Sequence, residues 1–426
     1  MKYATSLLTL LLFLANSGCS QPSSTENPIN VIPGEVAVSA MRVSNDARRI
    51  ARDTLIIDTH IDVPYRLYRN PDDVSQATTA GDFDYPRAMA GGLNAPFMSI
   101  YIPASKDASG EAYEFAVQSI ASVEQLAAEH PDKFAIATCS EDLARHFEQN
   151  LISLPLGMEN GGPISGQIDH LTYFFDQGIR YITLAHSKSN HISDSSYDSN
   201  EHWQGLSEFG KALIPQMNRL GIMVDVSHIS DNAFWQVMAL TQTPVLATHS
   251  SLRHFTPDFK RNMSDDMVVA LAKQGGVIQI NYGSAFLHRA AQDFSAQRNA
   301  AVLAYQQNQQ LPDDDPALLE YRKAYSERHP YPYASIENVL DHIDRVVELG
   351  GIDAVGIGSD YDGVGDTLPT HLKDVSTYPN LIQGLLDRGY SEPDIQQILG
   401  GNSLRVWRAA EDYAESQGTA IQCRSA

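Results

Sequence analysis

Cysteine is scarce in this sequence, and its spacing excludes one class of metal site. The 426 residues include 3 cysteines, Cys19, Cys139 and Cys423, and no two of them form a Cys-x-x-Cys pair. A thiolate zinc site and a dithiol redox motif are therefore not supported, so any metal must be held by histidine and carboxylate groups. Cys139 and Cys423 could form a disulfide in an oxidising compartment, but the sequence alone does not place them within bonding range.

Basic residues are also few, since 30 lysines and arginines stand against 52 aspartates and glutamates, for a formal net charge of -22. A surface of this sign repels phosphate backbones, so we expect no nucleic-acid partner. It also disfavours docking onto anionic lipid by charge alone. The length of 426 residues suits one large α/β barrel or two ordinary domains, and a hydrophobic fraction of 43 % allows a sizeable core.

The N-terminus carries an apolar run at residues 6–15, which is too short to span a bilayer but suits a signal-peptide core. Small residues lead from this run into Cys19. The arrangement resembles the bacterial lipoprotein signal, in which the cysteine is lipidated after cleavage, although Asn16 stands where that signal usually has leucine. An ordinary secretory signal with a chance cysteine is the alternative. We predict a lipoprotein-type signal at 1–19, a flexible tether at 20–39 and export to the periplasm or cell envelope, with a lipid anchor through Cys19.

After the tether, short aliphatic or β-branched runs alternate with longer amphipathic stretches. The runs lie at 54–58, 95–101, 152–158, 181–185, 222–226, 245–248, 277–281 and 354–358. Apolar residues recur at helical spacing in 111–129, 207–220, 231–240, 265–274 and 336–349. This alternation predicts a closed (β/α)8 TIM-type barrel over 40–415, followed by a tail at 416–426. An open doubly wound sheet is the alternative, but no Gly-x-Gly-x-x-Gly follows the first strand.

The segment 284–333 is polar and charged and lies between the seventh and eighth predicted strands. It predicts a helical insertion over the mouth of the barrel, and a role as a lid is a hypothesis.

Polar residues that suit catalysis or metal binding follow most of the predicted strands. They are His60 and Asp62 after the first, Glu159 after the third, His186 after the fourth, His228 after the fifth, His249 after the sixth, and Asp360 with Asp362 after the eighth. In a barrel of this type, such residues converge on one face, where the active site lies.

Each of these residues also has a structural explanation when it is taken alone. A single histidine after an apolar strand is usually structural, Glu159 could be a helix cap, and a turn explains Asp362 better than a functional role does. Together, however, the residues favour a metal site, because alternation along a strand end points His60 and Asp62 to the same side. Mixed imidazole and carboxylate donors suit Zn2+, with Mn2+ or Co2+ as substitutes.

Several segments, in this order along the chain, resemble the membrane (renal) dipeptidase family. They are Asp58-Thr-His-Ile-Asp62, Leu184-Ala-His-Ser-Lys-Ser-Asn190, Val224-Asp-Val-Ser-His228, Thr248-His-Ser-Ser251, Gly356-Ile-Gly-Ser-Asp-Tyr-Asp-Gly363 and Gly400-Gly-Asn-Ser-Leu-Arg405. The resemblance implies an amidohydrolase-type barrel with two zinc ions, which hydrolyses dipeptides, including those with a C-terminal D-residue, by a metal-bridging hydroxide. Family members often dimerise, so a homodimer is also implied.

The resemblance also implies a role for each residue. One zinc would be bound by His60 and Asp62, the other by His228 and His249, and Glu159 would bridge the two. The remaining three residues are implied to act on the substrate: His186 contacts it and stabilises the tetrahedral intermediate, Asp360 transfers the proton, and Arg261 binds the terminal carboxylate.

Some positions depart from the family pattern, which puts specificity rather than chemistry in question. The bridging motif usually reads Glu-Gly-Gly, whereas Asn160 follows Glu159 here. Asparagine tolerates left-handed backbone, so the turn can survive. His191 and the insertion also differ from the pattern.

Two other functions remain open from the sequence. The first is another binuclear amidohydrolase, acting on a cyclic amide, a lactone or an N-acyl amino acid. Such relatives typically begin with His-x-His and use a modified lysine as the bridge, whereas Asp62 and Glu159 occupy those places here. The second is an inactive lipoprotein that binds peptides or metal, which loss of a core ligand would have favoured.

Overall fold

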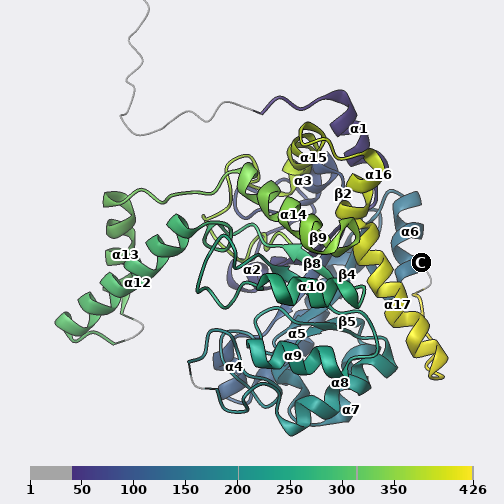
Figure 1. The fold of residues 1–426 in the computed structure, drawn as a ribbon, viewed down its shortest axis with the longest axis horizontal. Coiled ribbons are helices and arrows are strands. Elements are labelled where there is room, and N and C mark those ends of the chain that lie inside the picture. The colour runs from purple at the N-terminus through teal and green to yellow at the C-terminus, as the bar shows by residue number, and fades with distance from the viewer. Residues whose placement is uncertain (1–40, 200, 313–314, 425–426) are drawn as a thin grey trace, which may run out of the picture. The chain divides into compact units, whose positions relative to one another are not determined.

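The computed structural model describes residues 41–199, 201–312 and 315–424, and its central feature is a barrel of parallel strands surrounded by helices (Figure 1). The predicted signal, the tether and Cys19 lie outside the described residues. Among the helices of the described ranges, none is both long and apolar enough to cross a membrane.

The strands are short and almost entirely buried, as expected where helices cover a parallel sheet. They are β1 (Ile56–Ile61), β2 (Leu93–Tyr101), β3 (Phe134–Ala137), β4 (Ile152–Glu159), β5 (Ile179–Thr183), β6 (Met223–Asp225), β7 (Leu246–Ser250), β8 (Val277–Ile280) and β9 (Val355–Ile357). The eight predicted runs correspond to all of these except β3.

Closure of the barrel depends on a pairing between β2 and β4 that skips β3. The second half of β4 pairs with β2 through Met98 and Leu156 up to Tyr101 and Glu159. The first half of β4 pairs with β3 instead, beginning at Phe134. The remaining neighbours follow in the order β2-β1-β9-β8-β7-β6-β5-β4. The predicted TIM-type barrel is therefore confirmed, and β3 is an additional strand alongside it.

Helices follow the strands, and several begin at a serine whose side chain accepts a hydrogen bond from the first turn. Ser207, Ser230 and Ser264 cap α8, α9 and α10 in this way, which fixes where each helix begins. The helices are α1 (Asn45–Asp53), α2 (Val63–Arg69), α3 (Tyr85–Gly91), α4 (Ala104–Ala108), α5 (Ala112–Glu129), α6 (Ser140–Glu148), α7 (Ile168–Asp176), α8 (Glu208–Leu220), α9 (Asp231–Leu240), α10 (Asp265–Lys273), α11 (Ser284–Leu287), α12 (Arg289–Gln309), α13 (Pro316–Arg328), α14 (Ile336–Gly350), α15 (Tyr378–Asp387), α16 (Glu392–Gln396) and α17 (Asn402–Ser416).

The amino end of the barrel is closed by α17. Its Trp407 belongs to a buried cluster with residues from the first parts of the strands, among them Ile57, Leu246 and Val277. At the start of the same helix, Asn402 donates to the carbonyl oxygens of residues 352 and 355, next to β9. Residues 400–405, the last of the segments that resemble the family, therefore support the amino end of the barrel. The opposite, carboxyl end is free to carry the functional residues.

The predicted insertion before the eighth barrel strand is helical, as expected. It comprises α11, α12 and α13, and Figure 1 shows α12 and α13 together at one side of the barrel. The rings of Tyr305 and Tyr321 join these two helices by stacking with their centroids 4.3 Å apart.

A disulfide joins Cys139, at the start of α6, to Cys423 in the C-terminal tail. The pairing that the sequence left open is therefore present in the structure. It joins cysteines that are 284 positions apart in the sequence and is reinforced by Thr138, whose hydroxyl donates to the carbonyl oxygen of Gln422.

Candidate metal centre

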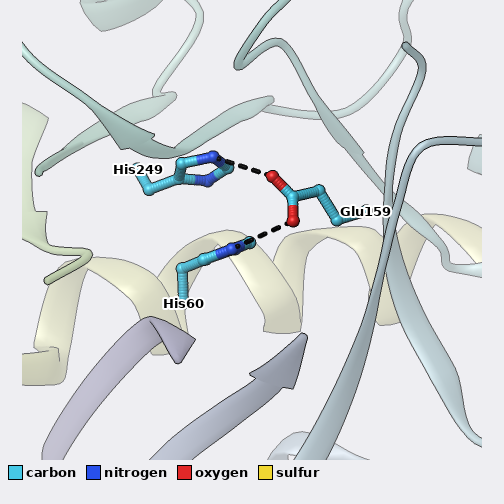
Figure 2. Close-up of side chains that lie close together, drawn as sticks. All are labelled: His60, Glu159 and His249. Atoms are coloured by element: carbon cyan, nitrogen blue, oxygen red, sulfur yellow. Dashed lines mark ion pairs between the residues drawn. The ribbon is translucent and has the colours of Figure 1, made fainter. Parts of the chain in front are cut away.

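Glu159, the last residue of β4, lies among histidines that end other strands of the barrel. Figure 2 shows its two carboxylate oxygens facing different imidazoles: Oε1 lies 3.2 Å from His249 Nε2 and Oε2 lies 3.4 Å from His60 Nε2. His228 Nε2 also lies 3.2 Å from Oε1. A carboxylate placed in this way can serve one cation with each oxygen.

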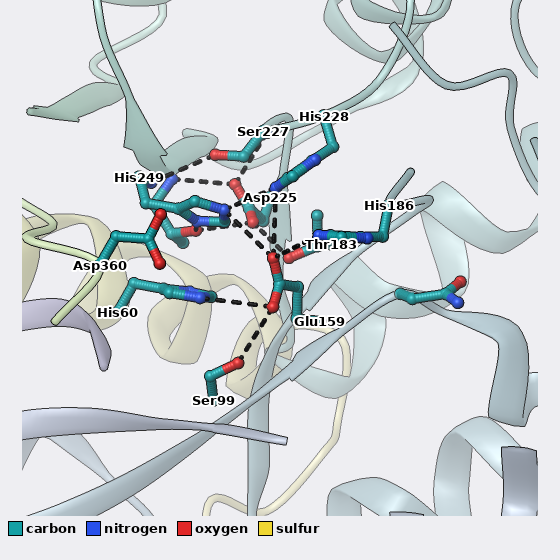
Figure 3. Close-up of polar contacts among 12 residues, drawn as sticks. His60, Ser99, Glu159, Thr183, His186, Asp225, Ser227, His228, His249 and Asp360 are labelled. Atoms are coloured by element: carbon teal, nitrogen blue, oxygen red, sulfur yellow. Dashed lines mark hydrogen bonds and ion pairs between the residues drawn. The ribbon is translucent and has the colours of Figure 1, made fainter. Parts of the chain in front are cut away.

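The three histidines form a continuous group (Figure 3). His228 lies just after β6 and His249 lies in the neighbouring strand β7, and their Nε2 atoms lie 2.7 Å apart. On its other side, the His249 ring stacks on the His60 ring, with centroids 3.7 Å apart. His249 therefore contacts both of the histidines that the sequence assigned to different ions.

Two aspartates complete the group on the side of β1 and β9. Asp62 Oδ2 lies 3.5 Å from His60 Nε2, and Asp360 accepts a hydrogen bond of 2.7 Å from Asn281 Nδ2. Both carboxylates press against Gly363: a Cβ added there would lie 2.1 Å from Asp62 Oδ2 and 2.2 Å from Asp360 Oδ1. Only glycine fits this position without moving the two carboxylates.

Several residues of the site have left-handed backbone, which sets the direction of their side chains. His228, Asp360 and Asp362 have φ values of 69°, 62° and 66°, and Asn160, which follows Glu159, has 76°. Non-glycine residues are uncommon in this region, where backbone strain often accompanies functional sites. The backbone of Asn160 agrees with the tolerance predicted for it.

A second set of residues, to which the sequence assigned no role, holds the histidines in place. The hydroxyl of Tyr181 lies 3.0 Å from His60 Nδ1. Thr248 Oγ1 lies 2.9 Å from His249 Nδ1 and donates to the buried carboxylate of Asp225 at 2.7 Å. Partners of this kind fix the orientation and tautomer of a metal-binding imidazole. An acidic residue inside an apolar strand was the available signal for Asp225.

Burial and like charges set the protonation states. Burial raises the pKa of Asp360 well above its ordinary value, and the carboxylate of Asp62 raises it further. Burial lowers the pKa of both His228 and His249 well below the ordinary value, so that both rings are neutral at neutral pH. Burial alone would raise the pKa of Glu159, but the nearby histidines hold it well below its ordinary value. The neutral imidazoles of His228 and His249 and the ionised carboxylate of Glu159 are the forms that bind a cation.

The donors present fit a metal ion. His60 Nε2 is buried and makes no hydrogen bond, although two carboxylates lie within 3.5 Å. Within this site, three groups have potential ligand atoms within 4.8 Å of one another: His60 with Glu159 and His249, Glu159 with His186 and His228, and His60 with Asp62 and Asp360. Nitrogen and oxygen donors in such clusters suit Zn2+.

His186 lies at the edge of the group rather than inside it. Its Nε2 is 3.5 Å from Glu159 Oε1, and its ring packs between Tyr101 and His228, at centroid distances of 4.8 Å and 4.2 Å. The side chain keeps 19 % of its surface exposed, so it can meet a molecule in the adjoining cavity.

Arg261 is buried behind His249 and supports the backbone there. It donates to Ser250 Oγ and to the carbonyl oxygen of His249, each at 2.7 Å. Its guanidinium lies over the ring of Phe286, and its Nε is buried with no hydrogen-bond partner among the described residues.

Asp362, which the sequence favoured as a turn residue, does occupy a left-handed turn, and its carboxylate is also buried there. It accepts a hydrogen bond of 2.6 Å from the backbone of Asp82 and lies 3.3 Å from Arg66 Nε. Burial raises the pKa of Asp362 to about 7. The residue ties the turn that carries Asp360 to a neighbouring loop.

A cavity of about 690 Å³ opens beside these residues. Its lining includes Asp62, Glu159, His186, His228 and Asp360, together with the aromatic side chains of Tyr65, Tyr101, Tyr197, Phe286 and Tyr331. Phe286 and Tyr331 belong to the predicted insertion, which therefore contributes to the wall of the cavity. A few polar groups in an otherwise apolar pocket are typical of a small-molecule site.

Comparisons with known proteins point to one peptidase family. A family model described as membrane dipeptidase (peptidase family M19) matches residues 44–420. Dipeptidase 3 of Mus musculus is 30% identical over 383 residues, covering 88% of this chain and 68% of that protein. An uncharacterized dipeptidase of Schizosaccharomyces pombe is 29% identical over 378 residues, covering 85% and 82%.

Solved structures share the fold. The probable dipeptidase PvdM from Pseudomonas aeruginosa matches with a TM-score of 0.75 and 27% identity, covering 87% of this chain and 98% of that one. A metallo peptidase from Rhodobacter sphaeroides, liganded with a phosphinate mimic of the dipeptide L-Ala-D-Ala, matches with a TM-score of 0.68 and 23% identity, covering 84% and 100%. The second likeness concerns the barrel alone.

Proposed function

Because this chain belongs to the membrane dipeptidase family, peptidase family M19, and is a metal-dependent dipeptidase, we propose that it binds two zinc ions and cleaves dipeptides in the cavity beside Glu159. His60 and Asp62 would hold one ion, and His228 and His249 the other.

The position of Glu159 carries this proposal. Its two oxygens face separate imidazoles, Oε1 towards His228 and His249 and Oε2 towards His60. Ser99 Oγ lies 3.2 Å from Oε2 and can fix the rotation of the carboxylate by donating to it. A bridging ligand needs this division between its two oxygens, whereas a helix cap does not.

The two ions, when bound, would activate the attacking water and polarise the scissile carbonyl. Asp360 would take the proton of that water and pass it to the leaving amine. Asn281, by donating to Asp360 Oδ2, would keep the other carboxylate oxygen turned towards the reaction. His186, at the edge of the cavity, would donate to the oxygen that gains negative charge.

Arg261 would bind the free C-terminal carboxylate of the dipeptide. An acidic protein needs a local positive charge for an anionic terminus, and guanidinium suits a carboxylate geometrically. The Nε of Arg261, which has no hydrogen-bond partner among the described residues, is one of the donors left for this purpose. Dipeptides with a C-terminal D-residue are candidate substrates as well.

The proposal includes export of the protein, with a lipid anchor at Cys19. The disulfide between Cys139 and Cys423 supports export, because such bonds persist in oxidising compartments and are rare in the cytosol.

Hydrolysis assays distinguish this function from the other amidohydrolase activities. Zinc-loaded protein is incubated with L-L dipeptides, L-D dipeptides and N-acylated dipeptides, and a chelator-treated sample serves as the control. We expect zinc-dependent release of free amino acids from the unblocked dipeptides. Activity confined to the N-acylated set would replace the proposal with an N-acyl amidohydrolase.

A further inference from the structure

We infer that the side chain of Asn160 is a positioning element, which holds the Glu159 carboxylate and the loop of His186 in a fixed relation. The inference rests on the proposed function, since it concerns how the same site is assembled.

The amide of Asn160 is buried, with 2 % of the residue exposed, and it bonds in several directions. Its Nδ2 donates to the carbonyl oxygen of Ile102 at 3.0 Å. Its Oδ1 accepts from the backbone of Gly162 at 3.1 Å and from Asn190 Nδ2 at 2.8 Å. The residue next to the central carboxylate is thus tied to segments distant in the sequence.

Asn190 closes the loop that carries His186. Its Nδ2 also donates to the carbonyl oxygen of Leu184 at 2.9 Å, and its Oδ1 accepts from the backbone of Ile192 at 2.7 Å. The loop between residues 184 and 190 is therefore held from its inside, and the bond to Asn160 attaches it to the end of β4.

The same amide pair joins the ends of three strands. Ile102 directly follows β2 and donates its N–H to the carbonyl oxygen of Glu159 at 2.9 Å, Asn160 follows β4, and Leu184 follows β5. Backbone pairing between the strands ends just before these three residues. In the loops that follow, the two asparagine side chains link the segments instead. These loops set the 3.5 Å separation of His186 Nε2 and Glu159 Oε1.

Catalytic groups must be held within about 0.5 Å of productive geometry, and a misplacement of about 1 Å can cost roughly 100-fold in rate. Replacement of Asn160 by glycine keeps the left-handed backbone available and removes only the amide. We therefore expect N160G to keep its zinc content and its KM, and to lose about 10-fold in kcat.

A double-mutant cycle with N190D tests the link itself. Aspartate keeps the acceptor for the backbone of Ile192 but lacks the donor that reaches Asn160. We expect N190D, which also removes the bond to the carbonyl oxygen of Leu184, to lower kcat as well. The losses should be less than multiplicative in the double variant, since both single variants remove the bond between the two side chains. Asn150 provides a matched control, because it is exposed and also left-handed, with a φ of 57°, so that N150G should leave kcat unchanged.

Unchanged kcat in N160G, or losses that multiply in the double variant, would overturn the inference. A loss of kcat accompanied by an equal loss of bound zinc would also overturn it, because Asn160 would then support the metal rather than the geometry of catalysis. If N160G does not fold, N190D alone decides by the same readouts. Absence of zinc-dependent hydrolysis in the unmodified protein would instead refute the proposed function.

Discussion

His228 Nε2 lies 2.7 Å from His249 Nε2, and both atoms lie 3.2 Å from Glu159 Oε1. Two imidazole nitrogens at this distance repel each other through their lone pairs unless a proton or a cation lies between them. Burial lowers the pKa of both rings, so each is neutral with a single ring proton, which can lie on Nδ1 or on Nε2. A cation shared with the carboxylate satisfies all three atoms.

Tyr181 is predicted to strengthen metal binding through His60, whose Nδ1 lies 3.0 Å from its hydroxyl. The variant Y181F keeps the packing of the ring and removes this partner. We expect zinc affinity to fall by about 10–100-fold, as is typical when such a partner is lost. Competition with a chromophoric chelator measures this affinity. Y282F is the matched control, because the buried hydroxyl of Tyr282 has no hydrogen-bond partner among the described residues, and equal losses in both variants would contradict the role of Tyr181.

Gly363 is predicted to be required for activity. In G363A the new methyl group would meet Asp62 Oδ2 at 2.1 Å and Asp360 Oδ1 at 2.2 Å, so one or both carboxylates must move. A displacement of this size at a catalytic group is expected to lower kcat by roughly 100-fold or more. Steady-state kinetics beside G365A provide the check, since nothing lies within 4 Å of a Cβ at Gly365 and only backbone strain is added there. Comparable activity in the two variants would show that the carboxylates are not held in this way.

Two roles could account for the buried position of Arg261, and the variant R261A distinguishes them. If it binds the substrate carboxylate, R261A should raise KM about 10-fold or more for free dipeptides and hardly affect C-terminally amidated ones. If it only supports the backbone at His249 through its bond to the carbonyl oxygen, kcat/KM should fall equally for both substrates. The ratio of kcat/KM for the two substrates decides between these roles.

His342 is predicted to make the fold sensitive to acid. Its Nδ1 accepts from the backbone of Leu252 and its Nε2 donates to the carbonyl oxygen of Leu287, each at 3.0 Å, so the buried ring is neutral. Burial lowers the pKa of His342 to about 4 from 6.5. The unfolded chain therefore binds an extra proton between these values, and the stabilisation is complete above about pH 6.5 and is lost as the pH falls towards 4.

The expected loss across this window is roughly 3 kcal/mol in the free energy of unfolding. Urea unfolding at pH 7.5 and pH 4.5 measures it, with H342Q as the variant that cannot titrate. The variant should lose less stability than the unmodified protein over the same interval. Equal losses would assign the acid sensitivity to other groups.

Much of the fold could be predicted because each barrel strand is buried on both faces and reads as an aliphatic run. The strand β3, Phe134–Ala137, escaped prediction; it pairs with just half of β4 and lies beside the closed barrel rather than within it. The residues at strand ends could be proposed as a site because closure of a barrel brings them to one face.

Other parts of the site depend on tertiary contacts that no local pattern carries. Tyr181 lies within a buried strand, where its ring gives no sign that the hydroxyl faces His60. Asn160 reaches a carbonyl 58 residues away in the sequence, and only the folded barrel shows which one. The disulfide of Cys139 likewise required the C-terminal tail to be placed beside α6.

Elemental analysis of bound zinc tests the central claim most directly. The purified protein should hold two zinc ions per chain, D360N should keep both while losing most turnover, and E159A should lose both. Retention of two zinc ions by E159A would contradict the bridging role of Glu159, and a single ion in the unmodified protein would contradict the two-metal centre itself.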